Sequence, residues 1–280
     1  MVNLSTVRGA LLGTTAAISL LVLAACGSDS AGNSALAEKA IAAQNSGTLT
    51  AAGALNAYAD ALKRNDVRHM VELGSSKTEF QEMQTKFADM KKLPVSADDR
   101  RQFNESFGRL TAAGAVDSIM KEIEPKLAEY KGQLPGYIAM GAGALQMQVA
   151  NSSVSAEEKA SATKAITAIQ TWASKTDFAD PKRARNAVTA LVDAATSINL
   201  KTPEDVKALS FEQAMEKVGV CLGGLKKALN AYDFDLDGIL GSLKVTDLAK
   251  PGEVQIKATV FGAELTSKAT LTQREGRWTQ

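Results

Sequence analysis

The most regular hydrophobic pattern in the chain runs from Ser210 to Tyr232. Apolar side chains recur there at alternating intervals of four and three residues, at Phe211, Met215, Val218, Leu222, Leu225, Leu229 and Tyr232. This spacing predicts an α-helix with one apolar face, and Ser210 with Gln213 has the form of a capping box at its start. Gly219 and Gly223 would let another helix come close. Because neighbouring segments also need their apolar faces covered, we expect the partner helix to come from the same chain.

Helix signals of this kind cover most of the chain before that segment. Polar N-cap residues precede apolar runs of helical period at Thr50, Ser76, Ser96, Ser155, Asp180 and Thr202. Ser76 and Ser155 are each followed three residues later by glutamate, which completes a capping box. Asp180 and Thr202 are each followed by proline, which favours the first helical position. Pro125 lies inside another periodic segment, where its missing N–H predicts a kink or a restart of the helix.

The hydrophobic period changes from 3.6 to 2 after Asp233. Apolar and polar residues alternate through Val254, Ile256, Ala258 and Val260. Phe261–Gly262 then permits a turn before a last alternating segment. We therefore predict an α+β fold that is predominantly helical, with a multi-helix array over residues 50–232 and a small C-terminal antiparallel β-meander within residues 240–280. Because a meander alone is only marginally stable, its apolar face should lie on the helices.

One segment without any charged residue spans residues 132–156 and is rich in glycine, alanine and methionine. A membrane-dipping or partner-binding helix would use Met140 and Met147 as adaptable apolar surface. A central helix packed on all sides by other helices would have the same composition. We favour the central helix, because the segment is short for a bilayer span and contains Gln146 and Gln148.

The N-terminus has the three-part layout of a secretory signal peptide. Residues 1–9 carry the single charge of Arg8, and an uncharged run that ends in small residues follows to residue 25. A run of about 16 residues is shorter than the roughly 20 that a membrane-spanning helix needs. We therefore expect residues 1–25 to be a signal peptide that is absent from the mature protein.

The four residues at the end of this run are Leu23, Ala24, Ala25 and Cys26. They resemble the bacterial lipobox, in which an aliphatic residue and two small residues precede an obligatory cysteine. The resemblance implies cleavage directly before Cys26 and attachment of a diacylglycerol to the Cys26 thiol. It therefore implies a lipoprotein that acyl chains hold at a membrane of the bacterial cell envelope.

Residues 26–49 are expected to form a flexible tether between the lipidated cysteine and a single folded domain over residues 50–280. Gly27–Ser34 consists almost entirely of glycine, serine, alanine and asparagine, which is typical of flexible linkers. Ala35–Ala43 has the pattern of a short helix within this region. No aspartate directly follows Cys26, which under the sorting rule of enterobacterial lipoproteins favours the outer membrane over the inner one. The domain would then face the periplasm.

Charge and cysteine content narrow the classes of function. The chain has 32 basic and 31 acidic residues, and loss of Arg8 with the signal peptide leaves 31 of each. A neutral chain argues against a nucleic-acid partner, which requires a basic surface. Lipidation of Cys26 would leave Cys221 as the remaining cysteine, so the mature domain has no intramolecular disulfide and must gain its stability from packing.

Two short stretches near the ends of the folded part are similar to NTF2-like lipoprotein domains. They are the opening helical segment with Tyr58, Leu62 and Asp66, and the last strands with Gly276–Trp278. The long helical middle departs from the mainly sheet body of that family. The resemblance is therefore confined to the two ends of the mature domain.

Asp233–Gly238 matches the opening positions of an EF-hand calcium loop, with Asp233, Asp235 and Asp237 as candidate ligands. The position that supplies a bidentate glutamate in that loop is Lys244. A segment in which outward aspartates alternate with inward apolar residues would have the same sequence pattern. Calcium binding is therefore an alternative interpretation and not the favoured one.

Residues suited to catalysis are few. His69 is the only histidine of the sequence, which excludes a site with two histidines, and nothing around His69 or Cys221 is typical of a nucleophile's setting. Carboxylate pairs that could serve a glycosidase are Asp98–Asp99, Glu122 with Glu124, and Glu157–Glu158. These acids lie in the first turns or on the exposed faces of predicted helices, where the helix dipole and water favour them.

These observations predict a lipid-anchored cell-envelope protein that is a non-enzymatic binding or structural module for a protein partner or an apolar ligand. We expect membrane contact through Cys26, no nucleic acid, no cofactor, no metal and no catalytic residue. The alternatives are a calcium-dependent module using Asp233, Asp235 and Asp237, and an envelope hydrolase.

Overall fold

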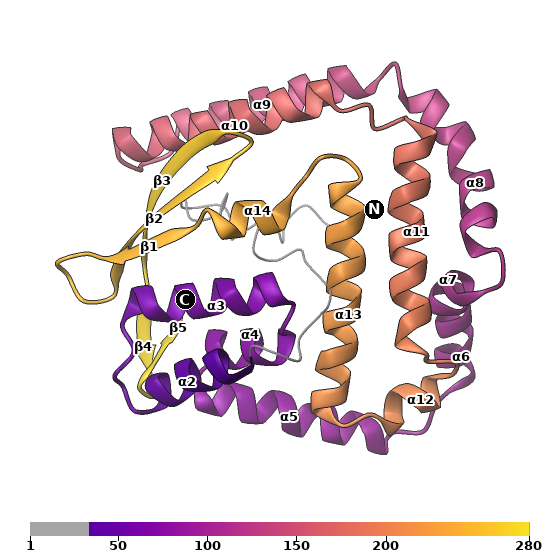
Figure 1. The fold of residues 1–280 in the computed structure, drawn as a ribbon, viewed down its shortest axis with the longest axis horizontal. Coiled ribbons are helices and arrows are strands. Elements are labelled where there is room, and N and C mark those ends of the chain that lie inside the picture. Colours follow the sequence, from indigo (N-terminus) through magenta and orange to yellow (C-terminus); the bar gives the residue numbers. More distant parts are fainter. Residues whose placement is uncertain (1–33, 280) are drawn as a thin grey trace.

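The computed structural model describes residues 34–279, in which a series of helices is followed by antiparallel strands (Figure 1). The helical elements are α2 Ser34–Asn45, α3 Ala51–Arg64, α4 Val67–Gly74, α5 Lys77–Lys92, α6 Ala97–Phe103, the π-helical turn η1 Asn104–Gly108, α7 Arg109–Thr111, α8 Ala115–Tyr130, α9 Leu134–Ala150, α10 Ala156–Lys175, α11 Pro181–Ile198, α12 Pro203–Ala208, α13 Phe211–Asn230 and α14 Leu236–Gly241. The strands are β1 Lys244–Asp247, β2 Glu253–Val260, β3 Ala263–Thr270, β4 Thr272–Arg274 and β5 Arg277–Thr279. The predicted α+β, mainly helical fold is confirmed. The signal peptide, the lipobox residues and Cys26 lie outside the described residues.

The predicted helix starts are confirmed by their caps. Side-chain caps are present at Thr50, Ser76, Ser96, Ser155, Asp180, Thr202 and Ser210. Each of these side chains accepts a hydrogen bond from a backbone N–H that has no partner within its own helix. Pro125 does not restart a helix, since α8 continues through it to Tyr130. The carbonyl that loses its donor there belongs to Lys121, an exposed residue, so water can hydrate it.

The helix with the regular apolar pattern, α13, packs against α11 of the same chain, as predicted. The two helices lie side by side and run in opposite directions, joined by α12 (Figure 1). The two helices come close at Gly224, where an added Cβ would collide with Ala194 and lie 3.0 Å from the carbonyl oxygen of Ala190. Gly219 faces the turn between α3 and α4 instead, and an added Cβ there would lie 2.8 Å from the carbonyl oxygen of Asn65.

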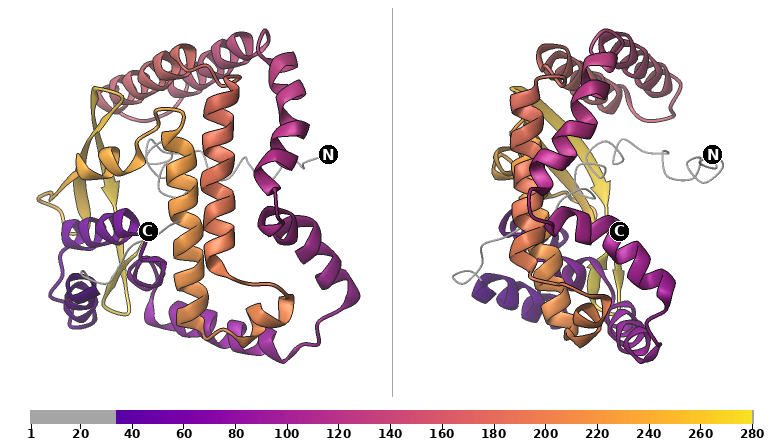
Figure 2. Two further views of the ribbon diagram at one scale, coloured as in Figure 1. Left: turned by 45° about the vertical axis from the view of Figure 1, so that its right-hand side comes forward. Right: turned by 90° about the vertical axis from the view of Figure 1, so that its right-hand side faces the viewer.

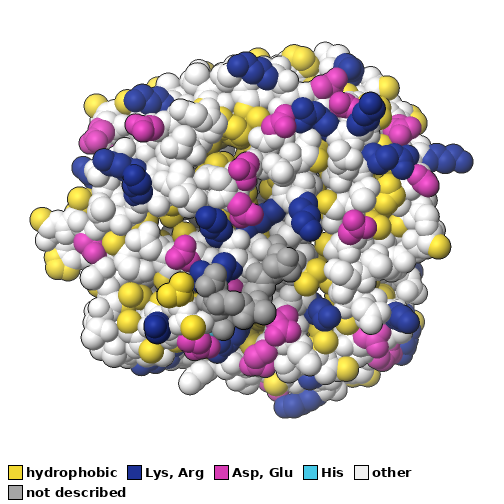
Figure 3. Space-filling view, viewed as in Figure 1, with side chains coloured by type: hydrophobic (Ala, Val, Ile, Leu, Met, Phe, Trp, Pro, Cys, Tyr) yellow, Lys and Arg dark blue, Asp and Glu magenta, His cyan; other side chains and the backbone are white. Residues whose placement is uncertain are grey.

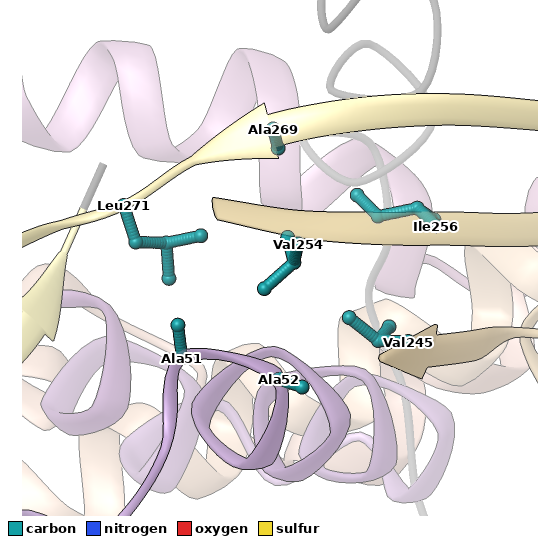
Figure 4. Packing of buried hydrophobic residues seen from close by; sticks show 7 residues of the cluster. All are labelled: Ala51, Ala52, Val245, Val254, Ile256, Ala269 and Leu271. Atoms are coloured by element: carbon teal, nitrogen blue, oxygen red, sulfur yellow. The ribbon is translucent and has the colours of Figure 1, made fainter. Parts of the chain in front are cut away.

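The strands form a β1–β2–β3 antiparallel meander and a separate β4–β5 hairpin. Phe261 and Gly262 both have positive φ, which suits the tight turn between β2 and β3. The buried face of the meander packs on α3, as expected for strands that are marginal alone. Figure 4 shows this cluster, which consists of Ala51, Ala52, Val245, Val254, Ile256, Ala269 and Leu271.

The folded part begins earlier than we expected from the sequence. We placed residues 34–49 in the tether, but α2 packs against α3, α4 and β5. Ala37, Ile41 and Gln44 of α2 are buried, and Gln44 Nε2 donates to the carbonyl oxygen of Leu73 at 3.1 Å. Ala37 and Ile41 are four residues apart and Gln44 follows three later, so these buried residues lie on one side of the short helix.

The elements are arranged so that α9 and α2 lie on opposite edges of the molecule. In Figure 1, α9 and α10 lie along one edge, whereas α2 and α5 lie along the opposite one, with α11 and α13 between them. Both views in Figure 2 keep this arrangement. The first described residue, Ser34, therefore belongs to the edge far from α9.

Candidate functional site

The segment without charges forms α9, a regular helix that is held at both ends by local interactions. Pro135 lies in its first turn, where the missing N–H costs no hydrogen bond. At the other end, Lys159 Nζ of α10 donates to the carbonyl oxygen of Ala150 at 2.8 Å. A cation at this position also interacts favourably with the helix dipole.

Most of α9 faces solvent, so our prediction of a central helix packed on all sides is wrong. Ala142 is its buried residue, whereas Tyr137, Met140, Leu145 and Met147 are 53%, 66%, 47% and 68% exposed. The reason is the position of α10, which packs on α9 and also on β3. On the sheet side Ala165 lies in a buried cluster with Val260 and Leu265. With α10 between it and the sheet, α9 is the outer helix of the pair.

The exposed side of α9 is unusual because it carries no charge and consists mainly of apolar and small residues, with Gln146 and Gln148 as exposed polar residues. Among the described residues, no neighbouring group lies within 4 Å of a Cβ added at Gly136, Gly141 or Gly143. Exposed apolar patches on soluble domains are typical of sites that bind another molecule. Methionine side chains suit such a site because they adapt to the shape of a partner.

The composition of α9 does not fit a helix that lies in a membrane surface. Such helices present tryptophan, phenylalanine or leucine opposite a face of lysine and arginine, whereas α9 carries no basic residue. Within residues 34–279, no helix is long and apolar enough to span a bilayer. On the face of the molecule in Figure 3, basic and acidic side chains are interspersed, with no large basic patch of the kind that a nucleic acid needs.

His69, singled out in the sequence, belongs to a charged cluster that fastens α2 to α4. Its side chain is buried, and Nδ1 lies 2.5 Å from Oδ2 of Asp66 while Nε2 lies 3.1 Å from Oε1 of Glu38. Arg68 Nη1 also donates to Oε1 of Glu38 at 2.9 Å. Nδ1 faces the Asp66 carboxylate, and Nε2 lies between the Glu38 carboxylate and Nη1 of Arg68, which is 2.8 Å away, so His69 acts as a clamp between elements. It has no free nitrogen with which to activate Cys221 on α13.

The two carboxylates determine the charge state of His69. The hydrogen bond to Asp66 raises the pKa of His69 above its ordinary value near 6.5, burial opposes this, and Glu38 raises the pKa further. In turn, the hydrogen bond from His69 lowers the pKa of Glu38. The carboxylates of Asp66 and Glu38 therefore favour the protonated form of His69, whereas the positive charge of Arg68 opposes it.

We expect the stability that His69 provides to decline as the pH rises above neutrality. A raised folded-state pKa means that the contribution is complete below about pH 6.5 and is lost as the pH rises through the raised pKa. Urea unfolding of the wild type and of His69→Gln at several pH values between 5.5 and 9 would measure the difference. The difference between the free energies of unfolding of the two proteins should become smaller toward high pH. A constant or widening gap would contradict this account.

A second buried charged residue, Arg277 of β5, connects the two ends of the described chain. Its guanidinium donates to Oδ1 of Asn45 at 2.9 Å and to the carbonyl oxygen of Glu72 at 3.1 Å, and lies 3.4 Å from Oε1 of Glu72. Sequence reasoning missed this role. The signal was the alternation in the last strand, in which Arg277 takes an inward position that an apolar residue would usually hold.

The aspartates of the candidate calcium loop bind different partners. Asp233 pairs with Arg183 at 2.8 Å, Asp235 caps α14 by accepting from the Gly238 N–H, and Asp237 lies 2.6 Å from Nζ of Lys226. Among the described residues, no cluster of three potential metal ligands occurs. In this arrangement three different basic or backbone partners separate the carboxylates that would have to converge, so the geometry gives the alternative of a calcium loop no support.

Lys226 explains why Asp237 points away from its neighbours. Its ammonium is buried and donates to the carbonyl oxygens of Leu62 and Lys63, which are the last carbonyls of α3. Burial lowers the pKa of Lys226, and Asp237 opposes this effect. The aspartate thus neutralises a buried cation that caps a helix C-terminus.

The carboxylate pairs have the structural positions expected from the sequence. Asp99 and Glu158 complete capping boxes of α6 and α10. Asp98 pairs with Arg101, Glu122 with Arg109 and Glu157 with Lys268. Burial raises the pKa of the Cys221 thiol, which disfavours the thiolate and hence its reactivity. None of these residues converges on a common reaction centre within residues 34–279.

No family model, no curated protein and no solved structure matches this chain.

Proposed function

We propose that the protein is a lipid-anchored component of the bacterial cell envelope that binds a protein partner through the exposed side of α9. The observation that carries this proposal is the exposure of a helix without charges, with Met140 and Met147 about two-thirds exposed. Leaving such surface in water is unfavourable, and a bound protein that covers it offsets that cost.

The anchor and the binding surface would lie at opposite edges. Cys26 precedes Ser34 by eight residues, and a fully extended chain of this length spans at most about 29 Å. Lipidation at Cys26 therefore keeps α2 close to the bilayer. Because α9 runs along the opposite edge (Figure 1), the membrane that holds the protein leaves its α9 surface accessible.

A protein suits this surface better than an apolar small molecule does. Small ligands bind in concave sites that enclose most of their surface. The exposed residues of α9 lie along the outside of a helix, which matches the groove or helix face of another protein. The proposal includes no catalytic step, since His69 and the paired carboxylates hold elements of the fold and burial raises the pKa of the Cys221 thiol.

The anchor is tested by comparing the two cysteines. We expect Cys26→Ser to abolish incorporation of labelled fatty acid and to release the protein from the membrane fraction or leave it as an uncleaved precursor. Cys221→Ser is the matched control and should keep both the label and the membrane attachment, because Cys221 lies in α13 of the folded domain. Fatty acid on Cys26→Ser, or an unacylated wild type, would contradict the anchor.

The binding surface is tested by photocrosslinking in intact cells. A photoreactive amino acid at Met140 of the full chain should yield a protein adduct on illumination, since this side chain is 66% exposed on α9. The matched control is Met90 of α5, which is 44% exposed and lies away from α9. Equal adducts at both positions, or none at Met140, would contradict a specific α9 surface.

A further inference from the structure

We infer that the partner of the α9 surface is a second copy of this chain, paired through α9 in antiparallel orientation. This inference rests on the proposed function of that surface and identifies its occupant. It starts from an exposed stripe along α9 and its two caps, formed by Gln133, Tyr137, Met140, Ala144, Met147 and Asn151. The intervals alternate between four and three residues, which is the spacing of a two-helix seam.

The stripe complements itself when a second copy is placed antiparallel. Residues whose numbers sum to 284 then meet across the seam, so Tyr137 lies against Met147 of the second copy. Met140 lies against the small Ala144 of the second copy, and Gln133 meets Asn151 of the second copy. The large side chains thus meet small or adaptable ones, sulfur meets an aromatic ring, and amides pair at both ends.

A parallel pair would match less well. Each residue would then face its own copy, with Ala144 against Ala144 leaving a gap and Tyr137 against Tyr137 crowding the seam. Cavities and overpacking both lower the stability of a contact.

Charge and size also favour a second copy. Residues 132–156 contain no charge, so two such surfaces approach without repulsion and without leaving an ion unpaired. Flanking positions hold Gly136, Gly143 and Ala150, which are exposed and allow the two helix axes to come close.

The contact along α9 is short, and anchoring both copies in one membrane compensates for its small area. A helix of 17 residues is about 25 Å long, so one helix pair gives an interface at the small end of the range for stable dimers. Two copies anchored in one membrane would hold α9 at the same height above it. Anchoring thereby raises the effective concentration of one copy for the other.

Disulfide trapping in the full chain tests both the partner and the register. In a Cys221→Ser background, we expect the double variant Tyr137→Cys with Met147→Cys to form a covalent dimer on mild oxidation of the membranes. Each single variant should form at least fivefold less dimer, because each cysteine faces the other position in the second copy. The two cysteines of one chain are about 15 Å apart along the helix, which is beyond the reach of a disulfide.

A charge in the seam provides the second test. Adding Ala144→Lys to the double variant should reduce the covalent dimer several-fold, since the ammonium would face Met140 of the second copy. Met90→Lys, an exposed position on α5, is the matched control and should leave the dimer unchanged.

The outcomes separate this inference from the proposed function. Dimer formation by the single variants at the level of the double variant would overturn the antiparallel register. A disulfide between α9 and a different protein, without a dimer, would reject the second copy and retain the proposed function. If the α9 cysteines form no adduct and the photocrosslinker at Met140 also captures nothing, both are rejected.

Discussion

Arg277→Ala is expected to lower the free energy of unfolding by about 3 kcal/mol, the lower end of the range for breaking a buried ion pair. The variant leaves the buried Glu72 with Arg68 as its remaining cationic partner, at 3.2 Å. It also removes the donor for Oδ1 of Asn45 and for the carbonyl oxygen of Glu72, both provided by Arg277. Urea unfolding followed by circular dichroism measures the loss.

The neighbouring hairpin residue Arg274 provides the control. It lies 3.4 Å from Glu79, but both side chains are about half exposed. Surface pairs of this kind contribute little to stability, so Arg274→Ala should unfold at the same urea concentration as the wild type. Equal losses for Arg274→Ala and Arg277→Ala would show that the buried network is not what holds β5 to α2 and α4.

Gly224→Ala is expected to destabilise the protein by up to about 2 kcal/mol, because overpacking a tight contact usually costs about 1–3 kcal/mol and the better helix propensity of alanine offsets part of that cost. The new methyl group would collide with Ala194 and lie 3.0 Å from the carbonyl oxygen of Ala190, so α11 and α13 would have to move apart. Alanine is the better helix former by up to about 1 kcal/mol, and this gain is already exceeded by the cost of separating the helices. Thermal and urea unfolding both measure the effect.

Two further variants show whether the helix contact is the cause. Adding Ala194→Gly removes the methyl group with which the new one collides, so the double variant should be more stable than the sum of the single effects. In α9, Gly143→Ala should be neutral or stabilising, because the position is open and alanine favours the helix. Destabilisation by Gly143→Ala equal to that by Gly224→Ala would contradict the distinction between the two sites.

Interactions between residues only a few positions apart could be predicted from the sequence. The caps at Ser76, Ser155 and Ser210 each join residues three positions apart, and the structure contains all of them as capping boxes. The alternating pattern likewise located the strands from Lys244 onward, because alternation reports directly which side of a strand is buried. The period does not change directly after Asp233 as predicted, since the short helix α14 comes before the first strand. Such signals depend on neighbouring residues and on little else.

The candidate site depended on contacts between distant residues and was predicted only in part. The sequence identified the segment without charges and offered partner binding as one of two interpretations. It favoured the wrong one, because an apolar helix has the same composition whether it is central or exposed. The choice depends on α10, which occupies the sheet side of α9 with residues such as Ala165.

The charged groups also show that local spacing does not predict contacts between distant residues. The spacing of Asp233, Asp235 and Asp237 suggested a common cation, whereas their partners Arg183 and Lys226 are brought to them by other helices. His69 and Arg277 were visible as residues, but their partners Glu38 and Glu72 come from segments that only folding places beside them. No local spacing encodes such pairs.

By itself, the sequence determined most of the helical and strand segments, many of their caps, the mainly helical α+β class and the presence of a long segment without charges, but not the short helix α14. These follow from hydrogen bonds and hydrophobic periods that span a few residues. The tertiary structure alone decided that α2 belongs to the folded part, that Gly224 is a point of tight helix contact and that α9 faces solvent. These features depend on which surfaces remain after all other helices have packed, and that competition involves the whole chain at once.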